Sequence, residues 1–153
     1  MANNQGRSST NTQSYPAAGV IADEKWVYKI DKNNKKIYNS EMITTKAEKI
    51  ADILSDGRSK ENKNLSITQV RKFYNEFKKH EISLTKDNFE ENKALIYMLK
   101  SKAAYSSEKI GENFKQFIFN AINSINSYEN FKDFMMFFEA VYGFLKNKPG
   151  IKK

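Results

Sequence analysis

The chain has 153 residues, of which 26 are lysine or arginine and 18 are aspartate or glutamate, so its formal charge is +8. This length allows one domain with a single hydrophobic core of adequate size. Because cysteine is absent, disulfides, thiolate metal sites and cysteine nucleophiles are excluded.

The N-terminal part differs in composition from the rest of the chain. Residues 1–22 are small and polar without periodicity, which indicates a flexible tail. Residues 26–38 begin with alternating apolar positions and continue into a turn-forming run of Asn and Lys. That pattern is compatible with a short hairpin, with an extended arm that places Trp26 on a partner, or with an unstructured leader. We therefore expect a flexible N-terminal arm over residues 1–41 and a helical domain over residues 42–153.

Helical periodicity begins near residue 45 and continues almost to the C-terminus. Two capping boxes, Thr45 with Glu48 and Ser66 with Gln69, mark the starts of the first two helices. The predicted helices run from Thr45 to about Gly57, from Ser66 to about His80, and over about 87–102, 107–125 and 130–146. The sequence therefore predicts an all-α fold, a compact bundle of about five helices.

Two of these helices carry specific expectations about burial. In the third helix, the residues expected in the core are Leu95, Ile96, Leu99 and Ala103. The fifth helix is apolar on nearly every side, since Met136, Phe137 and Phe144 lie off its main apolar stripe. That stripe consists of Phe131, Phe134, Met135, Phe138, Val141, Tyr142 and Leu145. A helix of that kind lies at the centre of a bundle or is shared with a neighbouring subunit.

The second helix has two chemically different faces when its residues are placed 100° apart. One face carries the apolar residues Val70, Phe73 and Phe77, flanked by Tyr74 and Ile67. The opposite face carries polar and basic residues, namely Arg71, Asn75 and Lys78 with Lys72 and Lys79 at the edge. The lysines alone are weak evidence of function, because 23 of the 26 basic residues are lysine. Arg71 is one of only three arginines, and a guanidinium suits bidentate contact with phosphate, so we favour a phosphate-binding face over a merely solvated one.

A second, weaker candidate surface lies on the third helix. Lys93, Tyr97 and Lys100 share one face, where an aromatic ring between two lysines could stack on a base or a sugar. Lys102 joins this face only if the helix ends near Ser101, and it points elsewhere if the helix continues.

Nothing in the sequence supports catalysis, a cofactor or a bound metal. His80 is the only histidine, and its place in the last turn of a helix is explained by a favourable interaction with the helix dipole. The acidic pair Glu90 and Glu91 opens a helix, where carboxylates are ordinary. No glycine-rich phosphate loop is present. We therefore expect a protein that is not an enzyme.

Three short runs, in order along the chain, resemble a known family. The run Thr-Gln-Val-Arg-Lys-Phe-Tyr-Asn over residues 68–75 resembles a signature helix of the small subunit of type III-A CRISPR effector complexes, the Csm small subunit. Residues 100–105 are similar to a Lys-x-Lys-x-x-Tyr-like run of that family. Residues 137–141 are similar to its Phe-Phe-Glu-Ala-Val-like run, which precedes a final basic residue, here Lys146. The resemblance spans about residues 42–147.

The resemblance implies a non-catalytic, RNA-binding small subunit of an RNA-guided interference complex. Such subunits stack in several copies beside the backbone subunits and form part of the channel for the guide RNA–target RNA duplex. In this interpretation Arg71, Lys72 and Lys78 neutralise backbone phosphates, and Lys100 and Lys102 extend the contact. The implied partners are guide RNA, target RNA, the other subunits of the complex and further copies of the chain.

Two other interpretations stay open. A helical assembly scaffold would use the fifth helix for contact, and its basic face would be incidental. A helix-turn-helix-like DNA-binding protein fits less well, because the link over residues 81–86 is long and Asp87, Glu90 and Glu91 would repel phosphates.

The sequence also indicates where the protein is expected. No apolar run of signal-peptide length is present near residue 1, and the longest apolar stretch, residues 134–145, is too short to span a bilayer and contains Glu139. We expect a cytoplasmic protein without a membrane partner.

Overall fold

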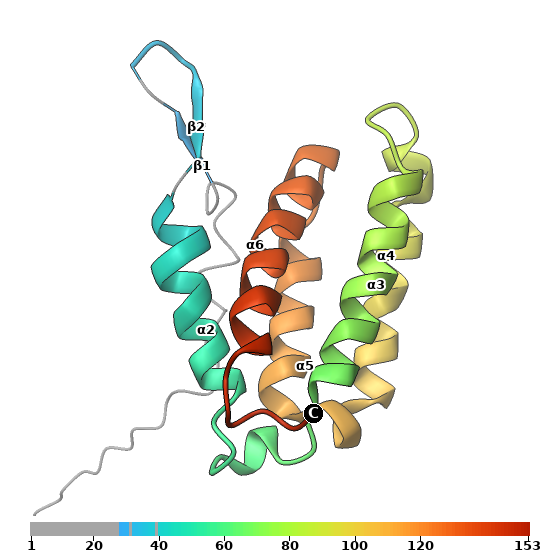
Figure 1. The fold of residues 1–153 in the computed structure, drawn as a ribbon. Helices are drawn as coiled ribbons and strands as arrows, with labels where there is room; N and C mark the ends of the chain where they lie inside the picture. The colour runs from blue at the N-terminus through green and yellow to red at the C-terminus, as the bar shows by residue number, and fades with distance from the viewer. Residues whose placement is uncertain (1–27, 31, 39) are drawn as a thin grey trace, which may run out of the picture.

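The computed structural model describes residues 28–30, 32–38 and 40–153 (Figure 1). The flexible tail expected over residues 1–22 and the expected role of Trp26 lie outside the described residues. In chain order, the elements are β1 (Tyr28–Ile30), β2 (Lys36–Tyr38), the π-helix η1 (Met42–Lys46), α2 (Ala47–Leu54), the 3-10 helix η2 (Lys60–Asn62), α3 (Ile67–Ser83), α4 (Phe89–Tyr105), α5 (Ser107–Ser124) and α6 (Tyr128–Lys146).

A short antiparallel hairpin precedes the helices. Tyr28 pairs with Tyr38 and Ile30 with Lys36, and Asn34 in the connecting turn has a φ of 62°, in the left-handed region that asparagine tolerates. The hairpin lies within the segment for which a hairpin was one of three alternatives. The division of the chain into an arm and a domain at residue 41 stays a prediction.

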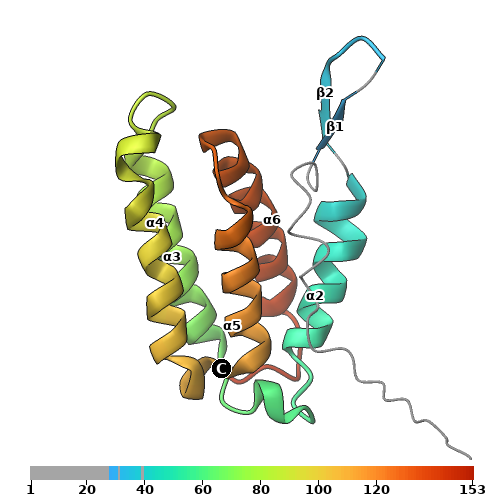
Figure 2. The same ribbon diagram turned by 180° about the vertical axis from the view of Figure 1, so that it is seen from behind.

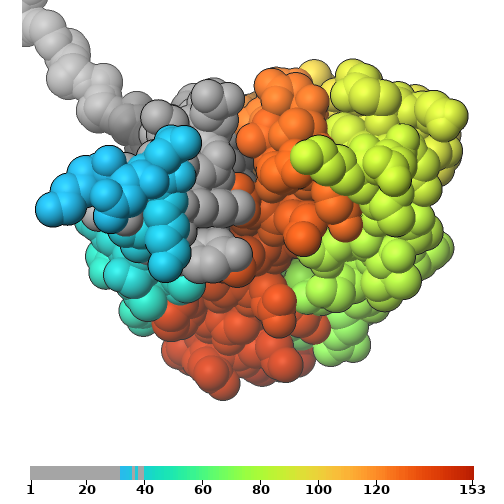
Figure 3. All heavy atoms as spheres, turned by 90° about the horizontal axis from the view of Figure 1, so that it is seen from above, coloured from blue at the N-terminus to red at the C-terminus, as the bar shows by residue number. Residues whose placement is uncertain are grey.

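The five α-helices form a bundle, as predicted. Figure 1 shows α2, α6 and α3 side by side with α4 and α5 behind them, and Figure 2 shows α4 and α5 from the opposite side. α6 packs against both α2 and α3, and α4 packs against α5. Seen from above, α6 and the end of α5 separate α2 from the α3–α4 pair (Figure 3). The all-α prediction is confirmed.

α6 lies at the centre because aromatic rings surround it. Phe134, Phe137 and Phe138 are fully buried, and the ring of Phe138 contacts rings on α3 and α5. Full burial of Phe137, which lies off the main apolar stripe, shows that α6 contributes more than one face to the core. Of the two alternatives for an all-round apolar helix, the structure therefore supports the central position.

Two local predictions are wrong. The capping box at Thr45 does not form, because the helical run already begins at Ser40 and passes through η1; no side chain caps α2 at Lys46. Leu95 was expected in the core but is 44% exposed, whereas the other three residues expected there, Ile96, Leu99 and Ala103, are buried together with Phe89. The sequence does not show on which flank of an apolar stripe the neighbouring helices will bury an additional apolar residue.

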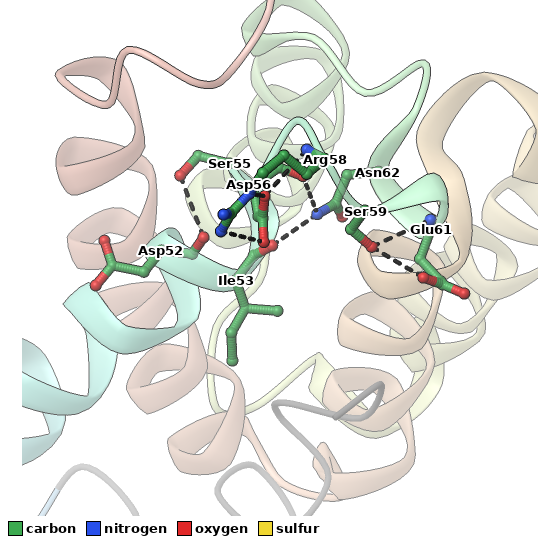
Figure 4. A network of polar contacts seen from close by, with 8 residues as sticks. All are labelled: Asp52, Ile53, Ser55, Asp56, Arg58, Ser59, Glu61 and Asn62. Atoms are coloured by element: carbon green, nitrogen blue, oxygen red, sulfur yellow. Dashed lines mark hydrogen bonds and ion pairs between the residues drawn. The ribbon is translucent and has the colours of Figure 1, made fainter. Parts of the chain in front are cut away.

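A compact polar network closes the connection between α2 and α3 (Figure 4). The buried Asn62 side-chain amide donates to the carbonyl oxygens of Ile53 at 2.7 Å and Asp56 at 3.1 Å. Asn113 of α5 donates to the Asn62 Oδ1 atom at 3.3 Å. These bonds give a buried donor to one carbonyl in the last turn of α2 and to one in the loop that follows, and they hold η2 against α5.

Gly111 permits this close approach. Its φ of +82° interrupts α5, and a Cβ atom at this position would lie 2.2 Å from the carbonyl oxygen of Glu61 in η2. Only glycine reaches this conformation without strain and leaves room for the opposing backbone. The first turn of α5 is therefore tied to the loop that precedes α3.

A pair of glycine substitutions tests this packing. Gly111→Ala should lower the free energy of unfolding by at least about 2 kcal/mol, because it combines an unfavourable φ with a backbone clash. Gly143→Ala is the matched control: no atom outside its own helix lies within 4 Å of the added Cβ, so α6 should gain about 0.5–1 kcal/mol. Urea denaturation followed by circular dichroism measures both variants. A Gly111→Ala protein as stable as the parent would contradict the close approach of η2 to α5.

Candidate nucleic-acid interface

α3 begins where two independent contacts hold its first turn. The Ser66 hydroxyl accepts a hydrogen bond from the Gln69 backbone N–H at 3.2 Å, which confirms the predicted N-cap. The backbone N–H of Ile67 donates to the carbonyl oxygen of Lys152 at 2.8 Å. The C-terminal segment thus supplies an acceptor for one of the backbone N–H groups in the first turn, which have no partner within the helix.

The two faces of α3 are as predicted. Val70, Phe73 and Phe77 are buried, whereas Arg71 and Lys72 are exposed and Lys78 is partly exposed. Lys72 forms no ion pair with any residue of the described ranges, so its charge is available to an external anion. The basic side chains on this face are therefore presented to solvent by a helix whose reverse side is held in the core.

Arg71 does not project freely but is held by α6. Its Nε atom donates to the hydroxyl oxygen of Tyr142 at 3.1 Å. The Tyr142 ring stacks on Tyr74 with a centroid separation of 5.1 Å and an interplanar angle of 21°. The Lys146 Nζ atom lies 5.4 Å from the centroid of Tyr142, which is a cation–π distance. We call these four residues, Arg71, Tyr74, Tyr142 and Lys146, the tyrosine platform.

The Tyr74 hydroxyl of this platform favours its neutral form. Burial, with the nearby Glu139 carboxylate as the second cause, raises the pKa of the Tyr74 hydroxyl. Both rings are only partly buried, so part of the platform faces solvent. Partly exposed aromatic rings beside two cations can accept a stacked base or a sugar while the cations face phosphates.

Lys78 is less available than the sequence indicated. Its Nζ atom forms an ion pair with Glu81 at 2.8 Å, and this hydrogen bond raises the pKa of Lys78. Beyond Lys78, a shallow hollow between α3 and α6 is lined by Glu81, Glu129 and Glu139 as well as by Lys132. An anion there would meet several carboxylates, so the cationic surface ends near Lys78.

Lys100 and Lys102 point to different neighbours, as expected for a helix that continues beyond Ser101. The Lys100 Nζ atom donates to Asn123 Oδ1 at 3.0 Å and lies 5.2 Å from the ring centroid of Phe119, both on α5. The Lys102 Nζ atom lies 4.0 Å from Glu76 and 5.8 Å from the ring centroid of Phe73, both on α3.

The five predicted residues therefore do not form one continuous track. Arg71, Lys72 and Lys78 share α3, and Lys102 borders that helix. Lys100 contacts Asn123 of α5, and the α4–α5 side of the bundle is in front in Figure 2 and behind in Figure 1. The predicted face of Lys93, Tyr97 and Lys100 is also partly occupied, because Lys93 pairs with Glu90 at 2.9 Å and the Tyr97 hydroxyl donates to the carbonyl oxygen of Ile125.

Sequence reasoning did not identify Tyr142 as part of the site. It placed Tyr142 on the core stripe of the fifth helix, 71 positions away from Arg71. The available local signal was Lys146, which follows Tyr142 by four residues and therefore lies on the same helical face. Tyr74 was recognised only as a flanking apolar residue. Their meeting depends on the packing of α3 against α6.

His80 has a different environment from the one expected. It lies in the last turn of α3, where the helix dipole would favour the imidazolium form. Burial nevertheless lowers the pKa of His80; the nearby Glu76 carboxylate acts in the opposite direction, and Lys79 acts in the same direction. Desolvation therefore outweighs the effects that favour the charged imidazole.

The residues that the structure describes contain no group of three or more His, Cys, Asp and Glu side chains arranged to hold a metal ion. No helix among them has both the length and the apolar character that crossing a bilayer requires.

Comparisons with known proteins identify the family. A family model described as Csm2 Type III-A matches residues 37–148, which is most of the chain and agrees with the resemblance found from the three runs. No curated protein and no solved structure matches.

The environment of His80 leads to a prediction about pH. Because burial disfavours the imidazolium, the pKa in the folded protein should lie below the value in urea-denatured chain, about 6.5. The stability that neutral His80 supports is fully present above the unfolded pKa and declines as the pH falls from there towards the folded pKa. NMR titration of the ring protons measures this without ambiguity, since the chain has one histidine.

His80→Gln is the control, because it should remove this part of the pH dependence of unfolding. A folded pKa at or above the denatured value would mean that the helix dipole and Glu76 dominate after all.

Proposed function

The chain belongs to the Csm2 family of type III-A CRISPR systems, the small subunit of the Csm complex, and we propose that it lines the guide RNA–target RNA channel of that complex through the cations of α3. Family membership implies assembly with the other Csm subunits and a guide RNA, and members of the family are generally non-catalytic structural subunits. Contact with target RNA, stacking of several copies and a cytoplasmic location are part of the proposal.

One observation carries this proposal: the guanidinium of Arg71 is oriented before RNA arrives. Its Nε atom donates to the Tyr142 hydroxyl at 3.1 Å, and the residue is exposed. The two Nη groups form no ion pair with the residues that the structure describes. A phosphate can accept two hydrogen bonds from those groups. Because the side chain is already held, less rotamer entropy is lost on binding.

The neighbouring residues suit a nucleic-acid strand rather than an isolated phosphate. Lys72, which forms no ion pair within the described residues, supplies a second cation next to Arg71, and the tyrosine platform offers stacking surface beside Lys146. Such a surface holds the backbone without identifying bases, which agrees with a complex in which guide pairing reads the sequence.

The other predicted residues take secondary places in this proposal. Lys78 contributes a charge that Glu81 partly offsets, and Lys102 extends the surface along the boundary of α3 and α4. Lys100 could contact RNA only on the α4–α5 side, so it would meet a different segment or strand from Arg71.

The structure weakens the two alternatives. In a helix-turn-helix-like protein α4 would be the recognition helix, yet its N-terminal turn carries the acidic Glu90 and Glu91. A scaffold that assembles through the fifth helix would need an exposed α6, and the apolar stripe of α6 is buried in this chain.

Loss of the α3 cations should weaken RNA binding without harming the fold. Arg71→Ala with Lys72→Ala should reduce affinity for a mixed-sequence single-stranded RNA, and the log–log salt slope should shrink by about one to two units. The unfolding free energy should change by no more than about 0.5 kcal/mol, because both residues are on the surface. Fluorescence anisotropy of labelled RNA at several salt concentrations measures both quantities.

Lys49→Ala with Lys60→Ala is the matched control, since it removes the same charge from exposed positions on α2 and η2 and should leave the slope near that of the parent. Tyr142→Phe keeps the ring but removes the acceptor of Arg71, so its affinity should fall between parent and double variant. Phe73→Ala should instead lower the free energy of unfolding by about 3–5 kcal/mol, because it opens a cavity in the core. Equal RNA binding by the Arg71→Ala/Lys72→Ala variant and the Lys49→Ala/Lys60→Ala control would refute the α3 surface.

The absence of catalysis is proposed as well. The purified chain should not cleave RNA with or without Mg²⁺, because one histidine and no cysteine leave no nucleophile–base pair to assemble. Gel analysis of RNA incubated with the protein tests this, and metal-dependent cleavage that co-purifies with the chain and survives His80→Gln would contradict it.

A further inference from the structure

The segment that follows α6 crosses the lower end of the bundle and reaches the start of α3 (Figure 1). We call residues 147–153 the C-terminal strap. The family model ends at residue 148, so most of the strap lies outside the part of the chain that identifies the family. The strap contains three lysines and no acidic residue. It therefore adds positive charge that the family resemblance does not account for.

The first half of the strap is fixed to α2. The Lys148 Nζ atom lies 2.7 Å from a carboxylate oxygen of Asp52 and 3.1 Å from one of Glu48. A Cβ atom on Gly150 would clash with the carbonyl oxygen of Ser55, the residue after α2, so the two backbones are in close contact. The charge of Lys148 is thus used within the protein to hold the strap in place.

The second half of the strap is fixed to α3 and α6. Ile151 is buried in the core, and the carbonyl oxygen of Lys152 accepts a hydrogen bond from the Ile67 backbone N–H at 2.8 Å. The Lys153 Nζ atom donates to the carbonyl oxygen of Lys146, the last residue of α6, at 3.4 Å. Lys152 and Lys153 are exposed, and neither forms an ion pair with a residue of the described ranges. Their backbone is therefore held while their charges stay available to an external anion.

The strap places these two lysines beside the tyrosine platform. Lys146, which accepts the hydrogen bond from Lys153, is itself a member of the platform. Ile67, which is bonded to Lys152, precedes Arg71 by four residues, or about 6 Å of helix. Five cations from three segments are consequently neighbours at this end of α3 and α6: Arg71, Lys72, Lys146, Lys152 and Lys153.

We propose that the RNA strand held by Arg71 continues over the C-terminal strap, where Lys152 and Lys153 neutralise further backbone phosphates. The proposal rests on the proposed function and adds a direction to it. In the other direction the cationic surface ends at Lys78, because several carboxylates line the hollow beyond it. A polyanion is attracted along the path towards the strap and repelled along the opposite one. The strap adds affinity without base preference, since lysines on phosphates read no sequence.

Removal of charge from the strap tests the proposal. Lys152→Ala with Lys153→Ala should weaken binding of the mixed-sequence single-stranded RNA and shrink the log–log salt slope by about 1.4 units, from two contacts at about 0.7 each. Lys152→Arg with Lys153→Arg keeps both charges and should keep the slope. Fluorescence anisotropy measures the slope, and urea denaturation verifies that each variant folds. An alanine variant with the slope of the parent would overturn the proposal.

Lys78→Ala with Lys79→Ala is the matched control for direction, since it removes the same charge from the opposite end of α3. Both lysines already have carboxylate partners, Glu81 at 2.8 Å and Glu76 at 3.4 Å. The slope should therefore change by less than in the strap variant. A larger change in this control would reverse the direction of the strand and refute the proposal.

A glycine substitution tests whether the position of the strap matters as well as its charge. Gly150→Ala keeps every lysine but displaces the strap from Ser55, so RNA affinity should fall roughly threefold, because the lysines must then be ordered on binding. Gly143→Ala, with open space at its Cβ atom, is the control and should bind RNA as the parent does. Equal affinity of the two glycine variants would contradict the proposal.

The same measurements separate this proposal from the proposed function. An unchanged slope in the strap variant, with a reduced slope in the Arg71→Ala/Lys72→Ala variant, would overturn this proposal alone. An unchanged slope in the Arg71→Ala/Lys72→Ala variant would overturn the proposed function. A strap variant that keeps its RNA affinity but no longer co-purifies with the other subunits would assign the strap to a protein contact, and the proposal would then be wrong.

Discussion

The aromatic packing around Phe138 is the constraint on which the rest of the bundle depends. Rings on three helices, those of Tyr74, Phe77, Phe114, Phe117 and Phe134, have centroids 5.3 to 6.3 Å from that of Phe138. Several of these contacts are edge-to-face, a geometry that ring quadrupoles favour and that tolerates little rotation. The orientations of α3 and α5 about their own axes are therefore set by α6.

The rotation of α3 decides what the surface offers. When Phe77 and Tyr74 face α6, the residues a quarter-turn away must lie at the boundary between the two helices, and Arg71 is there to reach Tyr142. The same rotation of α3 therefore fixes both the residues that it buries in the core and those that form the candidate RNA surface. The same reasoning applies to α4, where burial of Ile96 and Leu99 leaves Leu95 and Met98 on the outside. The candidate binding residues of this small domain are thus side chains that the core does not use.

Much of the fold could be predicted because the signals for a helix, apolar spacing and capping residues, lie close together in the sequence. Apolar spacing and the cap at Ser66 located α3, and the heavily apolar fifth helix proved to be central. The failures have a common cause. Thr45 was interpreted as a cap because its own neighbours permit one, but the helix begins earlier, at Ser40. Leu95 borders a core stripe, and only the neighbouring helices decide which border is covered.

The sequence by itself determined the helical class, the cation-bearing helix and the family, since periodicity, residue type and short motifs are properties of neighbours along the chain. The tertiary structure alone decided that Arg71 contacts Tyr142 and that Lys100 and Lys102 turn to different helices, α5 and α3. It also decided that burial is the main influence on the pKa of His80. The physical reason is that a side chain's partners depend on the rotation and packing of whole helices, and these follow from contacts between residues far apart in the chain.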